Sequence, residues 1–96
     1  MITHVVLFKL ADKSPGTIRK VEEMLLALKG KVPQVRSIEV GKDVLRSARS
    51  YDIALTVRFD SLKDLEAYQV HPDHREAADY IAKVREAIAV VDYESA

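Results

Sequence analysis

Apolar residues recur along the chain with two different periods, and the order of these periods constrains the fold more than any other feature. In residues 51–59 apolar side chains alternate with polar or small ones, which predicts a β-strand. In residues 15–30 they recur three, four and seven positions apart, which predicts one apolar face of an amphipathic helix. Ser14 followed by Pro15 is a typical helix start, because serine caps the first turn and proline fits its first position.

The remaining segments complete an alternating order of strands and helices. Further strands are expected at 2–10, 35–43 and 86–93. A helix is expected to begin after the N-cap Ser61, and Pro72 interrupts it, so a second short helix starts there. The inward residues of this second helix are expected to be Ala78, Ile81 and Ala82. The order β-α-β-β-α-β indicates an α+β, ferredoxin-like fold, in which helices cover one face of a four-stranded antiparallel sheet.

The first and last strands are apolar on both faces. Val5 and Leu7 have the opposite parity to Val6 and Phe8, and Val91 has the opposite parity to Val90. A sheet with one face in water should alternate more cleanly between apolar and polar residues. A second copy of the chain would cover the surplus, which predicts a homodimer. The alternative is a monomer whose open face tolerates a few valines, as many protein surfaces do.

Length and composition narrow the class of protein. The chain has 96 residues, which favours a single domain over 1–96. Fifteen basic side chains balance fifteen acidic ones, which argues against a nucleic-acid partner and against an anionic membrane surface. The absence of cysteine excludes disulfides, thiolate nucleophiles and cysteine-ligated metals. With no signal peptide and no membrane-spanning segment evident, we expect a cytoplasmic protein whose partner is a small molecule.

Histidines are the first candidates for chemistry, because histidine is the side chain that titrates nearest neutral pH. The chain has three, His4, His71 and His74, and two of them stand beside a tyrosine in the segment YQVHPDH at 68–74. His71 and His74 are three positions apart and could share a metal with His4. Pro72 breaks the helix between them, however, and no ligand-spaced carboxylates are nearby. We therefore expect neither a metal nor another cofactor.

Acid–base chemistry is the stronger possibility. Tyr68 lies on the apolar side of its helix, and His4 and Asp92 have the parity of the apolar residues on their strands. A histidine that is oriented by a carboxylate and faces a tyrosine can act as a general base. Each residue also has a structural interpretation: His71 as a helix cap, His74 as a solvated side chain, and His4 and Tyr68 as parts of the core.

Five segments, in order along nearly the whole chain, carry a resemblance to a known family. They are HVVLFKL at 4–10, GKDV at 41–44, YDIALTVRF at 51–59, YQVHPDH at 68–74 and VDY at 91–93. Together they resemble the stress-responsive A/B barrel (Dabb) family, which includes a plant polyketide cyclase. The resemblance implies a dimeric α+β barrel of ferredoxin-like subunits, in agreement with the dimer expected from the two-faced strands.

The resemblance also implies roles for individual residues. By it, His74 is the general base, Tyr68 positions or polarises the substrate, and Asp92 is an aspartate near His74. His4 becomes a pocket residue, while His71 has no assigned chemistry. The apolar substrate-binding positions become Val6, Phe8, Leu55, Val57, Ile88 and Val90. The positions that vary in the lining of such pockets become Val21, Glu22, Ala77, Tyr80 and Arg85.

Three functions remain open at this point. The first is a dimeric barrel that binds a small molecule and catalyses proton abstraction next to a carbonyl, as a cyclase, isomerase or lyase does. The second is a stress-response or ligand-binding protein without catalysis. The third is a cofactor-free monooxygenase of the dimeric barrel superfamily. Whether the chain is an enzyme therefore depends on how His74, Tyr68 and Asp92 meet in space.

Overall fold

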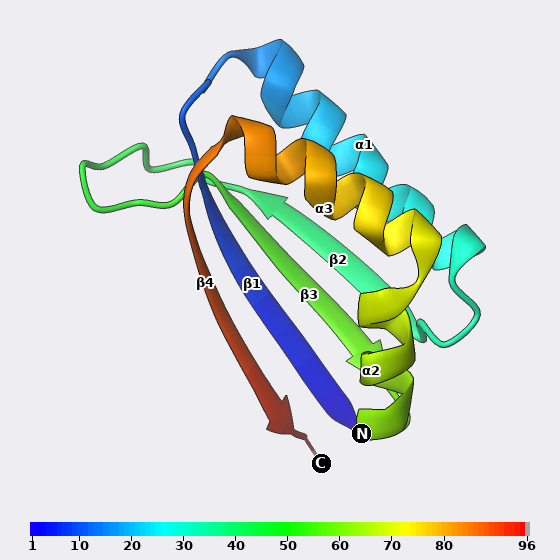
Figure 1. The fold of residues 1–96 in the computed structure, drawn as a ribbon. Helices are drawn as coiled ribbons and strands as arrows, with labels where there is room; N and C mark the ends of the chain where they lie inside the picture. Colours follow the sequence, from blue (N-terminus) through cyan, green and yellow to red (C-terminus); the bar gives the residue numbers. More distant parts are fainter. Residues whose placement is uncertain (96) are drawn as a thin grey trace.

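The computed structural model describes residues 1–95 and confirms the ferredoxin-like α+β fold (Figure 1). Its elements are β1 (Ile2–Leu10), α1 (Pro15–Lys31), β2 (Ser37–Lys42), β3 (Ile53–Phe59), α2 (Leu62–Val70), α3 (Pro72–Val84) and β4 (Arg85–Glu94). The second and third strands each begin two residues later than expected from the sequence pattern. Within the described residues, no helix is both long and apolar enough to cross a membrane.

The four strands form one antiparallel sheet in the order β2-β3-β1-β4. β1 lies at the centre and pairs with β4 along nearly its whole length, so the two ends of the chain run side by side (Figure 1). In this register His4 stands opposite Val57 on β3 and opposite Asp92 on β4. The pairing of β1 with β4 therefore decides which residues meet His4.

The helices cover one face of the sheet, and the core lies between them. Alternate residues of β1 and β3 are buried there, including Val6, Phe8, Leu55 and Phe59, together with residues of all three helices. β4 is an edge strand, so Ile88 and Val90 remain 42% and 52% exposed although they share this face of the sheet. The core therefore thins toward β4.

The inward face of α3 differs from the expected one. Ala77 and Ile81 are buried, whereas Ala78 and Ala82 are exposed. The expectation of an inward Ala82 was therefore wrong. The buried pair is four residues apart, which is the spacing of one face of a helix.

The junction between α2 and α3 depends on His71. Its backbone N–H donates to the Tyr68 carbonyl at the end of α2, and its Nδ1 accepts the Asp73 backbone N–H, at 3.1 Å, at the start of α3. Pro72 follows as the first residue of α3. The side chain of His71 therefore serves as the N-cap of α3.

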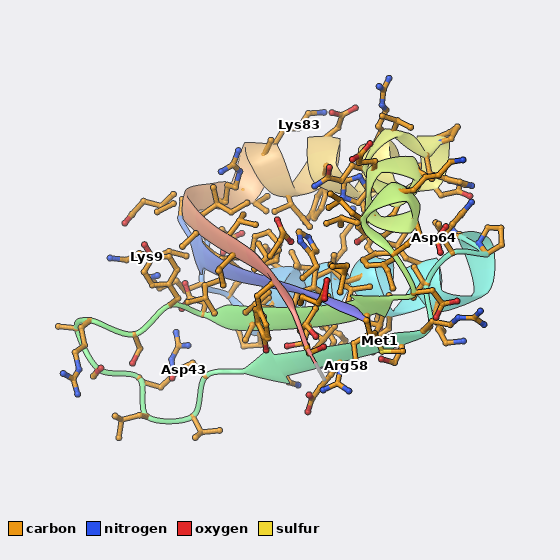
Figure 2. The ribbon with its side chains drawn as sticks, turned by 90° about the horizontal axis from the view of Figure 1, so that it is seen from below. Met1, Lys9, Asp43, Arg58, Asp64 and Lys83 are labelled. Atoms are coloured by element: carbon orange, nitrogen blue, oxygen red, sulfur yellow. The ribbon has the colours of Figure 1, made fainter. Side chains whose placement is uncertain are left out.

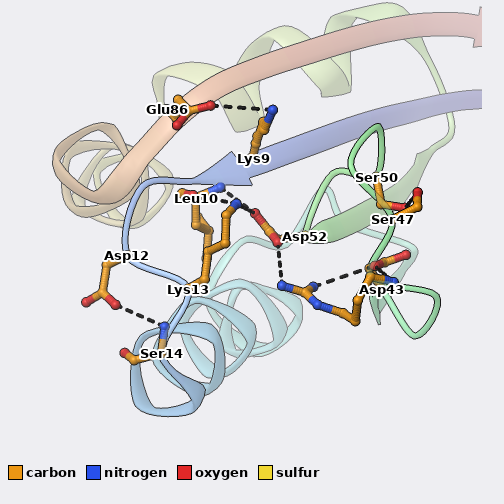
Figure 3. Close-up of polar contacts among 11 residues, drawn as sticks. Lys9, Leu10, Asp12, Lys13, Ser14, Asp43, Ser47, Ser50, Asp52 and Glu86 are labelled. Atoms are coloured by element: carbon orange, nitrogen blue, oxygen red, sulfur yellow. Dashed lines mark hydrogen bonds and ion pairs between the residues drawn. The ribbon is translucent and has the colours of Figure 1, made fainter.

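The loop between β2 and β3 lies at the end of the sheet opposite the chain termini. Figure 2 shows it extending past the end marked by Lys9 and Asp43, far from Met1 and Arg58. Asp52 is 2% exposed and anchors this loop (Figure 3). It accepts the Leu10 backbone N–H at 2.7 Å and Lys13 Nζ at 2.8 Å, and Arg46 lies 3.0 Å away. Burial raises the pKa of Asp52, but these three partners outweigh it and hold the pKa below its usual value.

The face of the sheet away from the helices carries the apolar surplus predicted from the sequence. Leu7, Val91 and Tyr93 are 37%, 55% and 48% exposed on this face, and Val5 beside them is half-buried. An exposed apolar patch of this kind marks a surface that meets a partner.

Candidate functional site

A cavity of about 210 Å³ lies between the thin end of the core and the helices. Its walls come from β1, β3, β4 and all three helices. The lining residues are His4, Val6, Phe8, Leu25, Leu55, Tyr68, Gln69, His74, Ala78, Ile81, Ile88 and Val90. Larger hollows of about 390 and 380 Å³ surround the loop at 43–52, but neither contains a histidine or Tyr68. The small cavity is therefore the one that gathers the candidate chemistry.

His4 enters the cavity from β1. Its Nδ1 is hydrogen-bonded to Oδ1 of Asp92, which stands directly opposite on β4. His4 is only 5% exposed, whereas the side chain of Asp92 is about one third exposed at the outer end of the pair. Because a carboxylate accepts, Nδ1 carries a proton, and Nε2 is the nitrogen left for the cavity.

Tyr68 packs against both His4 and His74 and is fully buried. Its ring centre is 6.1 Å from that of His4, in an edge-on arrangement, and 4.4 Å from that of His74. Phe59 packs on it at 5.1 Å. Its hydroxyl has no hydrogen-bond partner within the described residues. Burial raises the pKa of this phenol, so it stays protonated and remains available as a donor.

His74 lies in the first turn of α3. Its Nδ1 is 3.1 Å from the backbone carbonyl oxygen of Gln69, across the break between the two helices. A carbonyl can only accept, so Nδ1 holds the proton and Nε2 has the free lone pair. Burial lowers the pKa of His74, and the charges of His4, Arg75 and His71 act in the same direction, whereas the Gln69 carbonyl opposes them. The ring is therefore neutral near neutral pH and can accept a proton.

The structure pairs Asp92 with His4 and not with His74, where the family resemblance had placed it. The reason is the strand register, which sets Asp92 directly opposite His4. The carboxylate, histidine and tyrosine that meet are Asp92, His4 and Tyr68. Strand parity predicted this pairing, because it put His4 and Asp92 on the same face of the sheet.

Five of the six apolar positions expected to bind substrate line the cavity. They are Val6, Phe8, Leu55, Ile88 and Val90. Val57, the sixth, is fully buried in the core and is not part of the lining. Leu25, Gln69, Ala78 and Ile81 were not expected there, although Leu25 and Ile81 belonged to apolar helix faces that could have suggested them.

The five positions expected to vary in the lining all lie outside it. Two of them have partners elsewhere: Glu22 is 3.5 Å from Lys42, and Lys20 lies over the ring of Tyr80 at 4.3 Å. His71 also stays out of the cavity, since it caps α3. Within residues 1–95, no group of three histidine or acidic side chains is placed to hold a metal ion.

Comparison with known proteins agrees with this architecture. A family model for the stress responsive A/B barrel domain matches residues 2–95. The stress-response A/B barrel domain-containing protein DABB1 of Arabidopsis thaliana is 32% identical over 97% of this chain. A second stress-response A/B barrel domain-containing protein of the same plant is 29% identical over 97% of this chain. This chain corresponds to 46% of the first relative and to 36% of the second, so it spans less than half the length of either.

Solved structures share the fold closely. A dimeric ferredoxin-like protein from Bacteroides fragilis is 36% identical with a TM-score of 0.86, covering 98% of this chain and 95% of its own. One from Thermobifida fusca is 30% identical with a TM-score of 0.87, covering 98% and 90%. Both are described as having no known function. A hydroxynitrile lyase from Passiflora edulis shares the fold at 21% identity and a TM-score of 0.84, covering 96% and 90%. The match over residues 2–95 shows that this chain belongs to the stress-responsive A/B barrel domain family.

Proposed function

We propose that this domain binds a small carbonyl compound in the cavity and removes a proton from the carbon next to the carbonyl. The observation that carries the proposal is the meeting of two complementary groups in one apolar cavity. His74 offers a neutral ring with a free Nε2, and Tyr68 offers a buried hydroxyl without a partner among the described residues. A base and a donor placed this way suit enolate formation.

The cavity limits the size and polarity of the substrate. Its volume of about 210 Å³ is below the roughly 300–1,000 Å³ of pockets for drug-sized ligands. Apart from the two histidines, Tyr68 and Gln69, its lining is apolar. A compact molecule with an apolar body and one carbonyl oxygen fits these walls better than a long polyketide chain.

The reaction follows from the roles of the two groups. His74 Nε2 takes the proton, the C–H electron pair forms the new carbon–carbon double bond, and the carbonyl oxygen becomes an enolate. The hydroxyl of Tyr68 donates a hydrogen bond to that oxygen. The enolate then undergoes ring closure, isomerisation or cleavage, which are the cyclase, isomerase and lyase outcomes. The Passiflora edulis protein, which has the same fold, is described as a hydroxynitrile lyase.

Deuterium exchange tests the proposal without knowledge of the natural substrate. A panel of small aldehydes, ketones and β-keto acids is incubated with the protein in D₂O, and exchange next to the carbonyl is followed by NMR. We expect exchange that is lost in His74→Gln. His71→Asn is the matched control, because asparagine also caps helices and His71 lies outside the cavity. Equal exchange in wild type and His74→Gln would contradict the proposal.

Ligand binding without turnover is the second candidate, and the apolar lining of the cavity favours it. In that case a compound from the panel would bind, and its affinity would depend on apolar contacts such as Phe8 and Leu55. A screen for compounds that shift the melting temperature, repeated on His74→Gln, separates the two functions. Binding that survives the substitution, without exchange in wild type, indicates a binding protein.

We also propose that two copies of the chain pair through the open face of the sheet. The exposed apolar residues on that face and the dimeric state of the Bacteroides fragilis and Thermobifida fusca relatives support it. Sedimentation at micromolar concentration measures it directly. Leu7→Glu should dissociate the dimer, because it places a charge in the middle of the patch, whereas Glu39→Gln at the edge of the face should not. A wild-type monomer would contradict the proposal.

A further inference from the structure

We propose that His4, paired with Asp92, is a second acid–base group of the cavity, which carries a proton on Nε2 and donates it to the oxygen that becomes negative. This inference rests on the proposed function and assigns opposite roles to the two histidines. His74 accepts the proton from carbon, and His4 supplies one to oxygen.

The rings of His4 and His74 are held in the same way. Each is fixed through Nδ1, His4 by the Asp92 carboxylate and His74 by the Gln69 carbonyl. Within residues 1–95, neither Nε2 takes part in a hydrogen bond, and both rings line the cavity. The two rings therefore have the same atom free, and both contact Tyr68.

The hydrogen-bond partners of the two rings differ in charge. The partner of His4 is an anion, and a carboxylate at Nδ1 offsets positive charge on an imidazole ring, as it does in catalytic triads. The partner of His74 is a neutral carbonyl, and that ring is held neutral by burial. When two titratable groups in one site have environments that separate their protonation states, their acid and base roles follow.

The groups around His4 leave Asp92 as its only charge partner among the described residues that pack on it. Tyr68 on α2 stays a neutral phenol, His74 on α3 stays neutral, and the neighbour on β3 is the apolar Val57. The hydrogen bond to Asp92 therefore gives His4 a single carboxylate partner, which can be substituted.

The step balances with these residues alone. His74 Nε2 takes the proton from carbon, the C–H electron pair forms the new carbon–carbon double bond, the π pair of the carbonyl moves to oxygen, and His4 Nε2 gives its proton to that oxygen. The product is an enol, with His74 charged and His4 neutral. The reverse transfers, at another carbon of the substrate or at the same one, restore both rings. The hydroxyl of Tyr68 supplies the second hydrogen bond to the oxygen, which makes the donor set of an oxyanion hole.

4-Nitrophenol is a suitable probe, because its phenolate mimics an enolate oxygen and absorbs visible light, whereas the neutral phenol does not. We expect wild type to bind it as the phenolate, and Asp92→Asn to weaken this binding at least about tenfold, since hydrogen bonds to charged groups are stronger than neutral ones. Asparagine keeps an acceptor for Nδ1 but removes the charge. Nitrobenzene, which is neutral and similar in size, should bind both proteins equally. Glu94→Gln is the control for loss of a charge on β4.

Nitrogen NMR of the histidine rings gives a reading that a merely structural role for Asp92 would not change. In the complex with the phenolate, His4 should carry protons on both nitrogens and His74 only on Nδ1, and Asp92→Asn should remove the second proton from His4. Binding of the neutral phenol, no binding at millimolar probe, unchanged phenolate affinity in Asp92→Asn, or a singly protonated His4 in the wild-type phenolate complex would each overturn the inference. Deuterium exchange that persists despite such a result would leave the role of His74 intact, so the two proposals fail separately.

Discussion

Two regions of this molecule bury polar side chains, and they treat them in opposite ways. At the loop end of the sheet, Asp52 is as buried as a core residue but has a hydrogen bond or ion pair from Leu10, Lys13 and Arg46. At the cavity, the hydroxyl of Tyr68 is equally buried and has no partner within the described residues, and the Nε2 atoms of His4 and His74 are also free there.

The difference separates a structural network from a reactive one. A buried polar group without a partner costs about 1–3 kcal/mol, so a fold tolerates it where another molecule supplies the partner. Asp52 needs no such molecule, because the chain provides every contact. In the proposed function a ligand supplies the partners of the unpaired groups at the cavity, and substitutions in the two regions should then have opposite consequences.

The largest effect should follow from loss of the base. His74→Gln is expected to reduce deuterium exchange by roughly 10²–10⁴-fold, the usual contribution of a general base. Stability should change little, because the ring makes only one hydrogen bond among the described residues, to Gln69. Exchange rates and thermal unfolding of the same sample measure both quantities. A fall in stability that parallels the fall in rate would remove the distinction between the two regions.

Asp52→Ala should show the reverse pattern. It is expected to reduce the free energy of unfolding by about 2 kcal/mol, below the roughly 3–5 kcal/mol of a fully buried ion pair, because the side chains of Lys13 and Arg46 are 45% and 44% exposed and can regain water. Exchange at the cavity should be unchanged for the folded protein. Asp60→Ala, at the exposed pair with Arg36, is the control and should have a much smaller effect. Denaturant unfolding measures all three proteins.

Tyr68→Phe should change stability and activity in opposite directions. It removes the unpaired hydroxyl and keeps the ring against Phe59 and His74, so stability should rise by about 1 kcal/mol. Exchange should fall about tenfold, because the oxygen of the enolate loses one donor. A loss of stability would show that the hydroxyl already has a partner, such as a bound water, in the free protein.

The smallest effect concerns pH. The pKa of His74 is lowered from 6.5, so the unfolded chain gains a proton below pH 6.5 that the folded protein does not. The stability that depends on neutral His74 is therefore complete above pH 6.5 and is lost as pH falls through its lower folded pKa. Asp52 adds a second loss below pH 3.8, since its pKa is lowered as well. Denaturant unfolding curves at several pH values below 6.5 should show the loss of stability that depends on His74 in wild type but not in His74→Gln.

Much of the fold was predictable because it depends on local patterns. Alternation in 51–59 and helical spacing in 15–30 identify their elements without reference to the rest of the chain, and Ser14 and Ser61 cap helices as expected. The phase of α3 was less predictable, since His71 and Pro72 restart the helix at an angle that depends on the preceding one. Ile81 is buried as expected and Ala78 lines the cavity, but Ala77 and not Ala82 completes the inward face.

The candidate site was predictable in its membership and not in its pairing. His4, Tyr68, His74 and Asp92 were all expected near one cavity, and all four lie around it. Which histidine Asp92 meets depends on the register between β1 and β4, which joins residues 88 positions apart. The partner of His74 is a backbone carbonyl, and no sequence motif encodes a contact with an atom that every residue has.

Periodicity and capping residues, acting over a few neighbours, were sufficient for the order of strands and helices and for the apolar surplus on two strands, and residue type made histidine, tyrosine and aspartate the candidates for chemistry. Only the folded chain decided that Asp92 pairs with His4, that the Gln69 carbonyl orients His74, and that Tyr68 contacts both rings while its hydroxyl has no partner among the described residues. The physical reason is that side-chain type and spacing set local geometry, whereas hydrogen bonds between distant segments depend on register and helix phase. The function of the cavity depends on those bonds.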